Sequence, residues 1–127
     1  MFHVHGWVEI LKTTDGDEDR RELDAVVDHL RGTAKELGLA DRVDIVGVGG
    51  SYILRLTLVQ NRERGDLDRC QELVEDLAAT APGSYGVIYV RDDEQSGEMR
   101  RLVVRRGRAM LVADDVLSPL VPTIEDP

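Results

Sequence analysis

Two histidines near the start of the chain have the plainest potential for chemistry. His3 and His5 are two residues apart in a segment that reads as a strand, so both imidazoles are expected on one face of a sheet, where they could share a metal ion. A zinc site needs about two further ligands, and no spacing of Cys, His or acidic residues elsewhere points to this strand. We therefore expect a structural or surface role for both, with a metal site as the alternative.

Clustered carboxylates form a second group. Asp92, Asp93 and Glu94 follow a predicted strand, and Asp114 and Asp115 follow the last apolar segment. Neighbouring carboxylates can be stabilised by a divalent cation, but these lack the spacing of a calcium-binding loop. A solvated turn and a surface that meets basic residues of a protein partner are the other interpretations.

Nucleophilic catalysis and phosphate binding have little support. Cys70 lies at an apolar position of a predicted helix without a histidine nearby, which is typical of a buried, inert thiol. None of the serines follows a strand-to-helix elbow. The segment Gly47–Gly50 is glycine-rich, but a second strand follows it, so a hairpin is predicted in place of a phosphate loop. We expect no enzyme activity and no cofactor.

Two helices and several strands must position these groups. Apolar residues recur every three or four positions in 23–37 and in 67–81, which predicts two helices with one buried stripe each. Gly38 is expected to end the first helix, and Asp66 to cap the second. The segments that read as strands are Phe2–Lys12, Arg42–Gly49, Ser51–Val59, Ser84–Arg91, Met99–Arg105 and Ala109–Val112.

This order predicts an α+β fold. Two helices with one apolar stripe each need the same face of one sheet, so we expect a two-layer sandwich. The order β-α-β-β-α-β is ferredoxin-like, and a C-terminal β extension and an extended, proline-containing tail follow it. The length of 127 residues suits one core, so residues 1–127 are expected to form a single domain.

The formal net charge of −9 limits the classes of partner. Strong acidity argues against nucleic acid and against anionic membrane surfaces, and it fits a basic protein partner or simple solubility. Arginines cluster between Arg100 and Arg108, so one edge is expected to be basic, with these arginines paired to nearby acids across strands. No signal-peptide pattern and no apolar run of ~18 residues is visible, so we expect a cytoplasmic protein without a membrane span.

Three segments carry a family resemblance. His5-Gly6-Trp7 opens the chain, Ala81–Glu94 lies in its second half, and Leu117–Asp126 closes it. In this order and near these positions they resemble immunity protein family seven of bacterial polymorphic toxin systems, over essentially the whole chain. The resemblance implies an α+β fold and a protein that binds and neutralises a cognate toxin domain encoded beside it, with a basic nuclease as one candidate toxin.

The resemblance also implies a protein interface. Tyr85 and Tyr89 are an even number of residues apart and should share a face, which is either an exposed patch or core. In the same way, Trp7 and Tyr85 are either interface anchors or core residues. The residues that we expect at the toxin interface are Asp92, Asp93, Glu94, Asp114, Asp115, Glu125, Asp126, Trp7 and Tyr85.

The C-terminal segment Leu117–Asp126 is expected to dock on the body of the fold, with Ile124 packed and Glu125 and Asp126 at a rim. Its two prolines restrict the unfolded chain.

A small ferredoxin-like module that binds a metabolite or a metal is the alternative function, and a scaffold domain without a dedicated ligand is a third. The sequence leaves the oligomeric state open.

Overall fold

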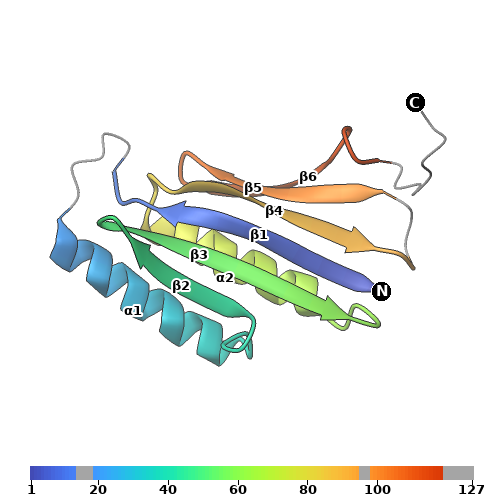
Figure 1. The fold of residues 1–127 in the computed structure, drawn as a ribbon, viewed down its shortest axis with the longest axis horizontal. Coiled ribbons are helices and arrows are strands. Elements are labelled where there is room, and N and C mark those ends of the chain that lie inside the picture. The colour runs from blue at the N-terminus through green and yellow to red at the C-terminus, as the bar shows by residue number, and fades with distance from the viewer. Residues whose placement is uncertain (14–18, 95–97, 119–127) are drawn as a thin grey trace.

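A computed structural model describes residues 1–13, 19–94 and 98–118 of the chain. The six strands form one antiparallel sheet in the order β2-β3-β1-β4-β5-β6. Both helices lie on the same side of this sheet, which gives two layers (Figure 1). The elements are β1 (Phe2–Ile10), α1 (Arg20–Glu36), β2 (Val43–Val48), β3 (Ser51–Gln60), α2 (Asp66–Thr80), β4 (Tyr85–Asp92), β5 (Met99–Arg105) and β6 (Arg108–Ala113).

The α+β class is confirmed, but the strand order is not that of a simple ferredoxin fold. The predicted β extension joins the same sheet, because β5 pairs with β4 and β6 pairs with β5. Strands that follow one another through short connections pair most readily with their chain neighbours. The sheet therefore has six strands, and β1 and β4 lie at its centre.

One hydrophobic core lies between the helices and the sheet. Side chains alternate along β3, so that Leu54, Leu56 and Leu58 are all buried in this core. Cys70 is also buried, and desolvation raises the pKa of its thiol to about 12, so the thiolate is disfavoured. The helical residues in this core are Leu23, Val26, Val27, Leu30, Ala34, Cys70, Leu73, Val74, Leu77 and Ala78.

The helix ends agree only in part with the prediction. Gly38 follows α1 with a φ of 72°, the left-handed conformation expected of a glycine that ends a helix. The cap of α2 was predicted wrongly, because Gly65 occupies the N-cap position and no side chain caps it. Asp66 is instead the first residue of α2, where it is buried and accepts hydrogen bonds from Gln60 and Arg69.

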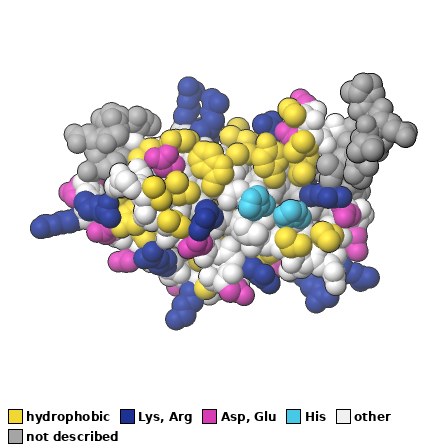
Figure 2. All heavy atoms as spheres, viewed as in Figure 1, with side chains coloured by type: hydrophobic (Ala, Val, Ile, Leu, Met, Phe, Trp, Pro, Cys, Tyr) yellow, Lys and Arg dark blue, Asp and Glu magenta, His cyan; other side chains and the backbone are white. Residues whose placement is uncertain are grey.

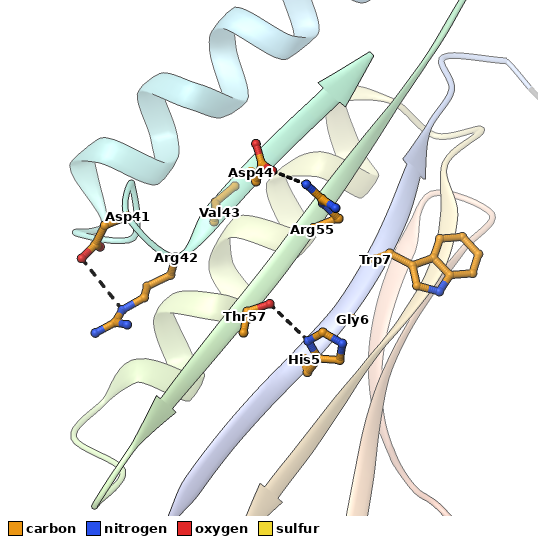
Figure 3. Close-up of a pocket in the computed structure, with 9 residues that line it drawn as sticks. All are labelled: His5, Gly6, Trp7, Asp41, Arg42, Val43, Asp44, Arg55 and Thr57. Carbon is orange, nitrogen blue, oxygen red and sulfur yellow. Dashed lines mark hydrogen bonds and ion pairs between the residues drawn. The ribbon is translucent and has the colours of Figure 1, made fainter. Parts of the chain in front are cut away.

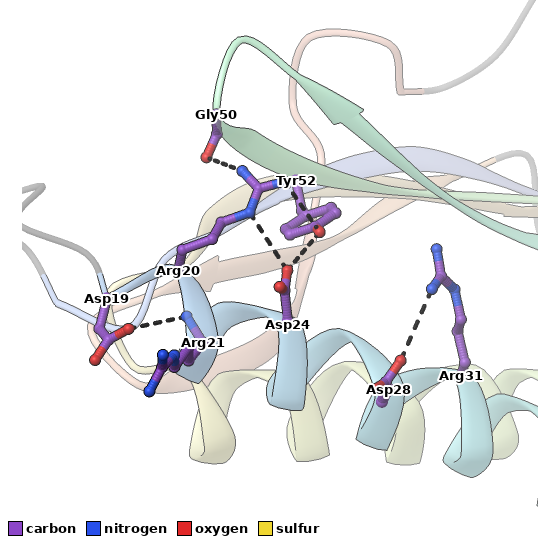
Figure 4. A network of polar contacts seen from close by, with 8 residues as sticks. All are labelled: Asp19, Arg20, Arg21, Asp24, Asp28, Arg31, Gly50 and Tyr52. Atoms are coloured by element: carbon purple, nitrogen blue, oxygen red, sulfur yellow. Dashed lines mark hydrogen bonds and ion pairs between the residues drawn. The ribbon is translucent and has the colours of Figure 1, made fainter.

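A polar network ties α1 to the hairpin between β2 and β3 (Figure 4). The hydroxyl of Tyr52 donates to Asp24 over 2.6 Å, and Arg20 donates to the Gly50 carbonyl over 3.3 Å. The guanidinium of Arg20 also lies 4.9 Å from the centre of the Tyr52 ring. The hydrogen bond to Asp24 raises the pKa of Tyr52.

Within the described ranges, neither helix has the length and apolarity that crossing a membrane requires.

Candidate functional site

Within residues 1–13, 19–94 and 98–118, no helix lies over one face of the sheet. Side chains alternate along each strand, so the strands that bury one set of residues under α1 and α2 present the other set on this uncovered face. Hydrophobic side chains gather over its middle, with histidine side chains among them (Figure 2). On the two central strands the outward residues are His3, His5, Trp7, Glu9, Tyr85, Val87, Tyr89 and Arg91.

An apolar row crosses this face. Trp7 pairs with Val87 between β1 and β4, Val87 pairs with Val103 in β5, and Val103 pairs with Met110 in β6. Trp7 and Met110 are 43% and 48% exposed, high values for such large apolar side chains. We call Trp7, Val87, Val103 and Met110 the apolar row. A connected exposed patch of this kind is typical of an interaction surface.

Two aromatic side chains meet beside the row. The rings of Trp7 and Tyr85 lie edge to face, with 6.2 Å between their centroids and 84° between their planes. The Tyr85 hydroxyl donates to Glu9, which raises the pKa of Tyr85. Tyr85 is 45% exposed, and Tyr89 lies on the same face, as predicted. Of the two interpretations, the exposed patch is therefore confirmed and the core position of Trp7 and Tyr85 is excluded.

Two glycines let the central strands approach each other beneath this aromatic pair. A Cβ on Gly6 would lie 2.2 Å from the carbonyl oxygen of Val87, and a Cβ on Gly86 would lie 2.1 Å from that of Trp7. Both distances are far below any van der Waals contact. Glycine at these positions is therefore required for the observed pairing of β1 with β4, and through it for the position of Trp7.

An open pocket of about 500 Å³ lies next to Trp7 (Figure 3). Its polar side chains already have partners within the chain. Arg55 forms an ion pair with Asp44, and Nδ1 of His5 lies 3.1 Å from the hydroxyl oxygen of Thr57. The pocket could receive a side chain of a partner protein. It is lined by His5, Gly6, Trp7, Asp41, Arg42, Val43, Asp44, Arg55 and Thr57.

The histidine pair shares a face, as its spacing predicts. The ring centroids of His3 and His5 are 6.2 Å apart. Among the residues that the structure describes, no group of three or more His, Cys, Asp or Glu side chains is arranged to hold a metal ion. Within the described ranges, His3 and His5 therefore have no third residue that could complete a metal site with them.

Two of the predicted interface acids are buried. Asp92 is 6% exposed and accepts a hydrogen bond from the backbone of Glu94 over 3.1 Å. Asp114 is 1% exposed, lies 3.1 Å from the guanidinium of Arg101, and accepts from the Leu117 backbone over 2.8 Å. Asp92 thus accepts within its own turn, and Asp114 links β5 to the residues that follow β6. Both carboxylates are buried, which corrects the expectation that they form part of an exposed acidic surface.

The other predicted acids differ in their availability. Asp93 lies 2.7 Å from Arg91 and 3.6 Å from the N-terminal amino group, and Glu94 lies 3.6 Å from Arg62. Asp115 is exposed. The structure thus brings Asp93 and Glu94 together after β4 but already pairs each with a basic group. Glu125 and Asp126 lie outside the described residues, as does the predicted packing of Ile124.

Sequence reasoning missed three members of the apolar row. Val87, Val103 and Met110 each lie in a segment that was predicted as a strand, but nothing local indicated that they would be register partners. The sequence does show that each of them lies an even number of residues from other outward-facing residues of its own strand. That spacing shows which residues of one strand share a face, and only the pairing register aligns one strand with the next.

The comparisons with known proteins bear on identity. A search of curated proteins and a search of solved structures both gave no match. A protein-family model for immunity protein 7 matches residues 1–126, which include every segment of the fold and the whole uncovered face. The chain therefore belongs to the immunity protein 7 family.

Proposed function

We propose that this immunity protein binds a cognate toxin domain through the uncovered face of its sheet and so neutralises it. The family supplies the class of function. The observation that supports this face as the contact surface is the apolar row, with Trp7 and Tyr85 exposed on the two central strands. The proposed action is binding and not catalysis, in the cytoplasm of the cell that makes the toxin.

The physical basis of the proposal is the energetics of protein interfaces. A few aromatic or large apolar side chains usually contribute most of the binding free energy when water is excluded around them. Trp7 stands on a strand that is paired on both sides, so little conformational freedom of its backbone would be lost on binding. The pocket beside Trp7 makes this surface concave at one place, where a protruding side chain of a partner could bind.

The exposed acids would form part of the rim in this proposal. Asp93, Glu94 and Asp115 follow the ends of β4 and β6, away from the middle of the face. In a chain with a net charge of −9, such acids would accelerate association with a basic toxin, for which a nuclease is one candidate. Because Asp93 and Glu94 already have basic partners, we expect an effect on association rate more than on final affinity.

A growth assay tests the proposal directly. The C-terminal domain encoded by the gene immediately upstream would be expressed in a laboratory host with and without this protein. We expect wild-type protein to restore growth and Trp7→Ala to restore it poorly, with a weaker Kd in a titration of the purified partners. Val48→Ala is the control, since Val48 is an exposed apolar residue on edge strand β2, outside the row.

Two outcomes would count against the proposal in different ways. If the neighbouring domain is toxic and wild-type protein neither relieves toxicity nor binds, this domain is not the partner. If wild-type and Trp7→Ala protect and bind equally well, toxin neutralisation stands but the uncovered face is not the contact surface. Melting temperatures of both variants must match that of the wild type for the comparison to hold.

A further inference from the structure

The hairpin between β5 and β6 carries three arginines that have no anionic partner among the residues that the structure describes. Arg105 ends β5, Arg106 lies in the turn, and Arg108 begins β6. All three are exposed, and none forms a side-chain hydrogen bond or ion pair with any residue that the structure describes. By contrast, Arg101 in the same strand pairs with Asp114, as the predicted pairing of these arginines with nearby acids requires. For the three hairpin arginines the described residues include no such pair.

Their placement is unfavourable for folding. Arg105 and Arg108 are direct cross-strand partners, and like charges in such pairs repel each other. Arg106 has a φ of 52° in a two-residue turn with Gly107, a conformation that costs a residue with a Cβ about 1–2 kcal/mol. Asn, Asp or Gly is usual there. Local conflicts that converge on one place often mark a functional site.

The hairpin arginines surround a hollow that continues the apolar row. This hollow of about 380 Å³ is lined by Val103, Arg105, Arg106, Arg108 and Met110. Val103 and Met110 are the last two members of the row, so the arginines border one end of the surface described above. Guanidinium groups donate paired hydrogen bonds that match the geometry of carboxylates.

The hairpin and the acidic residues lie at opposite ends of the face. The strands β4 and β6 run in the same direction, since both are antiparallel to β5. Asp93, Glu94 and Asp115 follow the ends of β4 and β6, whereas the arginine hairpin precedes β6 (Figure 1). The apolar row therefore lies between the arginine hairpin and the end of the face at which Asp93, Glu94 and Asp115 follow their strands.

We propose that the arginine hairpin binds carboxylate groups on the surface of the toxin domain and thereby sets the orientation in which the toxin docks. This inference rests on the proposed function. A protein surface is favoured over nucleic acid because the hollow has an apolar floor, contains no aromatic residue for base stacking, and belongs to a chain with a net charge of −9. The partner implied has an apolar patch with Asp or Glu side chains at one edge.

The test compares two triple variants of equal charge. One carries Arg105→Gln, Arg106→Gly and Arg108→Gln; the control carries Arg21→Gln, Lys35→Gln and Arg64→Gln. The three control residues are exposed and form no ion pair within the described residues. Both triples make the formal net charge of −9 more negative by three. The hairpin triple should fold at least as well as wild type, since it removes the like-charge pair and places glycine at a positive φ.

Binding of the purified upstream-encoded domain is then measured at low and high salt. We expect the hairpin triple to bind at least about tenfold more weakly than the control triple, and to lose much of the salt dependence that the wild type shows. Equal affinities of the two triples would overturn the inference. So would tight binding of a single-stranded oligonucleotide by the wild type that only the hairpin triple loses. Failure of the wild type itself to bind the domain would instead count against the proposed function.

Discussion

The indole of Trp7 and the ring of Tyr85 meet edge to face across β1 and β4, with their centroids 6.2 Å apart. They are diagonal neighbours, because Trp7 pairs directly with Val87 and Tyr85 pairs directly with Glu9. Aromatic pairs at such positions contribute to sheet stability, and here Trp7 and Tyr85 remain 43% and 45% exposed. The hydroxyl of Tyr85 also donates a hydrogen bond to Glu9.

This hydrogen bond predicts an alkaline pH dependence. The folded chain holds the pKa of Tyr85 above its ordinary value of 10.0, chiefly because Glu9 accepts the phenolic proton. The Tyr85–Glu9 hydrogen bond therefore stabilises the folded chain fully below pH 10, and this stabilisation is lost as the pH rises through the pKa of Tyr85 in the folded state. In a Tyr52→Phe, Tyr89→Phe background, the ultraviolet titration of Tyr85 should move to lower pH on Glu9→Gln. Glu22→Gln, an exposed helical acid, is the control and should not move it.

The close approach of the central strands predicts that Gly6→Ala is destabilising. The new Cβ would meet the Val87 carbonyl oxygen at 2.2 Å, and we expect the free energy of unfolding to fall by about 1–3 kcal/mol in urea denaturation. Gly32→Ala is a matched control in α1, where a Cβ meets nothing within 4 Å. It should raise the free energy of unfolding by about 1 kcal/mol. Equal effects of the two substitutions would contradict the observed packing.

The burial of Asp114 predicts a structural role for this carboxylate. Asp114→Asn would weaken its contacts with Arg101 and with the Leu117 backbone, and we expect a loss of about 1–3 kcal/mol, since Arg101 itself is partly exposed. Asp115→Asn changes the same charge at the next, exposed position and should alter stability by less than about 0.5 kcal/mol. Chemical denaturation of both variants decides between a structural and a surface role.

Charge reversal at the exposed acids should slow toxin capture. Replacement of Asp93, Glu94 and Asp115 by Lys reverses three exposed charges at one end of the uncovered face, and the association rate with a basic toxin should fall several-fold at low salt. Stopped-flow mixing measures this rate. Replacement of the exposed α2 acids Asp68, Glu72 and Glu75 by Lys is the control of equal charge. If both triples slow association equally, net charge matters and the position of the acids does not.

Local patterns in the sequence were sufficient for most of the secondary structure. The apolar stripes of α1 and α2, the alternation of β3 and the turn at Gly49-Gly50, with φ values of 56° and 88°, depend on residues close together in the chain. The family could also be recognised from short segments, and the family model confirms it over residues 1–126. Each of these features is a local preference of the backbone or of a contiguous segment, so the sequence alone determined it.

Only the tertiary structure decided which side chains meet. Trp7 and Met110 are far apart in the sequence, yet the registers of three strand pairs place them at the two ends of one apolar row. Tertiary packing also buries Asp114 against Arg101 while it leaves Arg105 and Arg108 exposed and opposed to each other. A change of one residue in register would turn a strand's outward residues inward. Registers depend on the whole sheet and the core beneath it, and no segment of the sequence encodes them by itself.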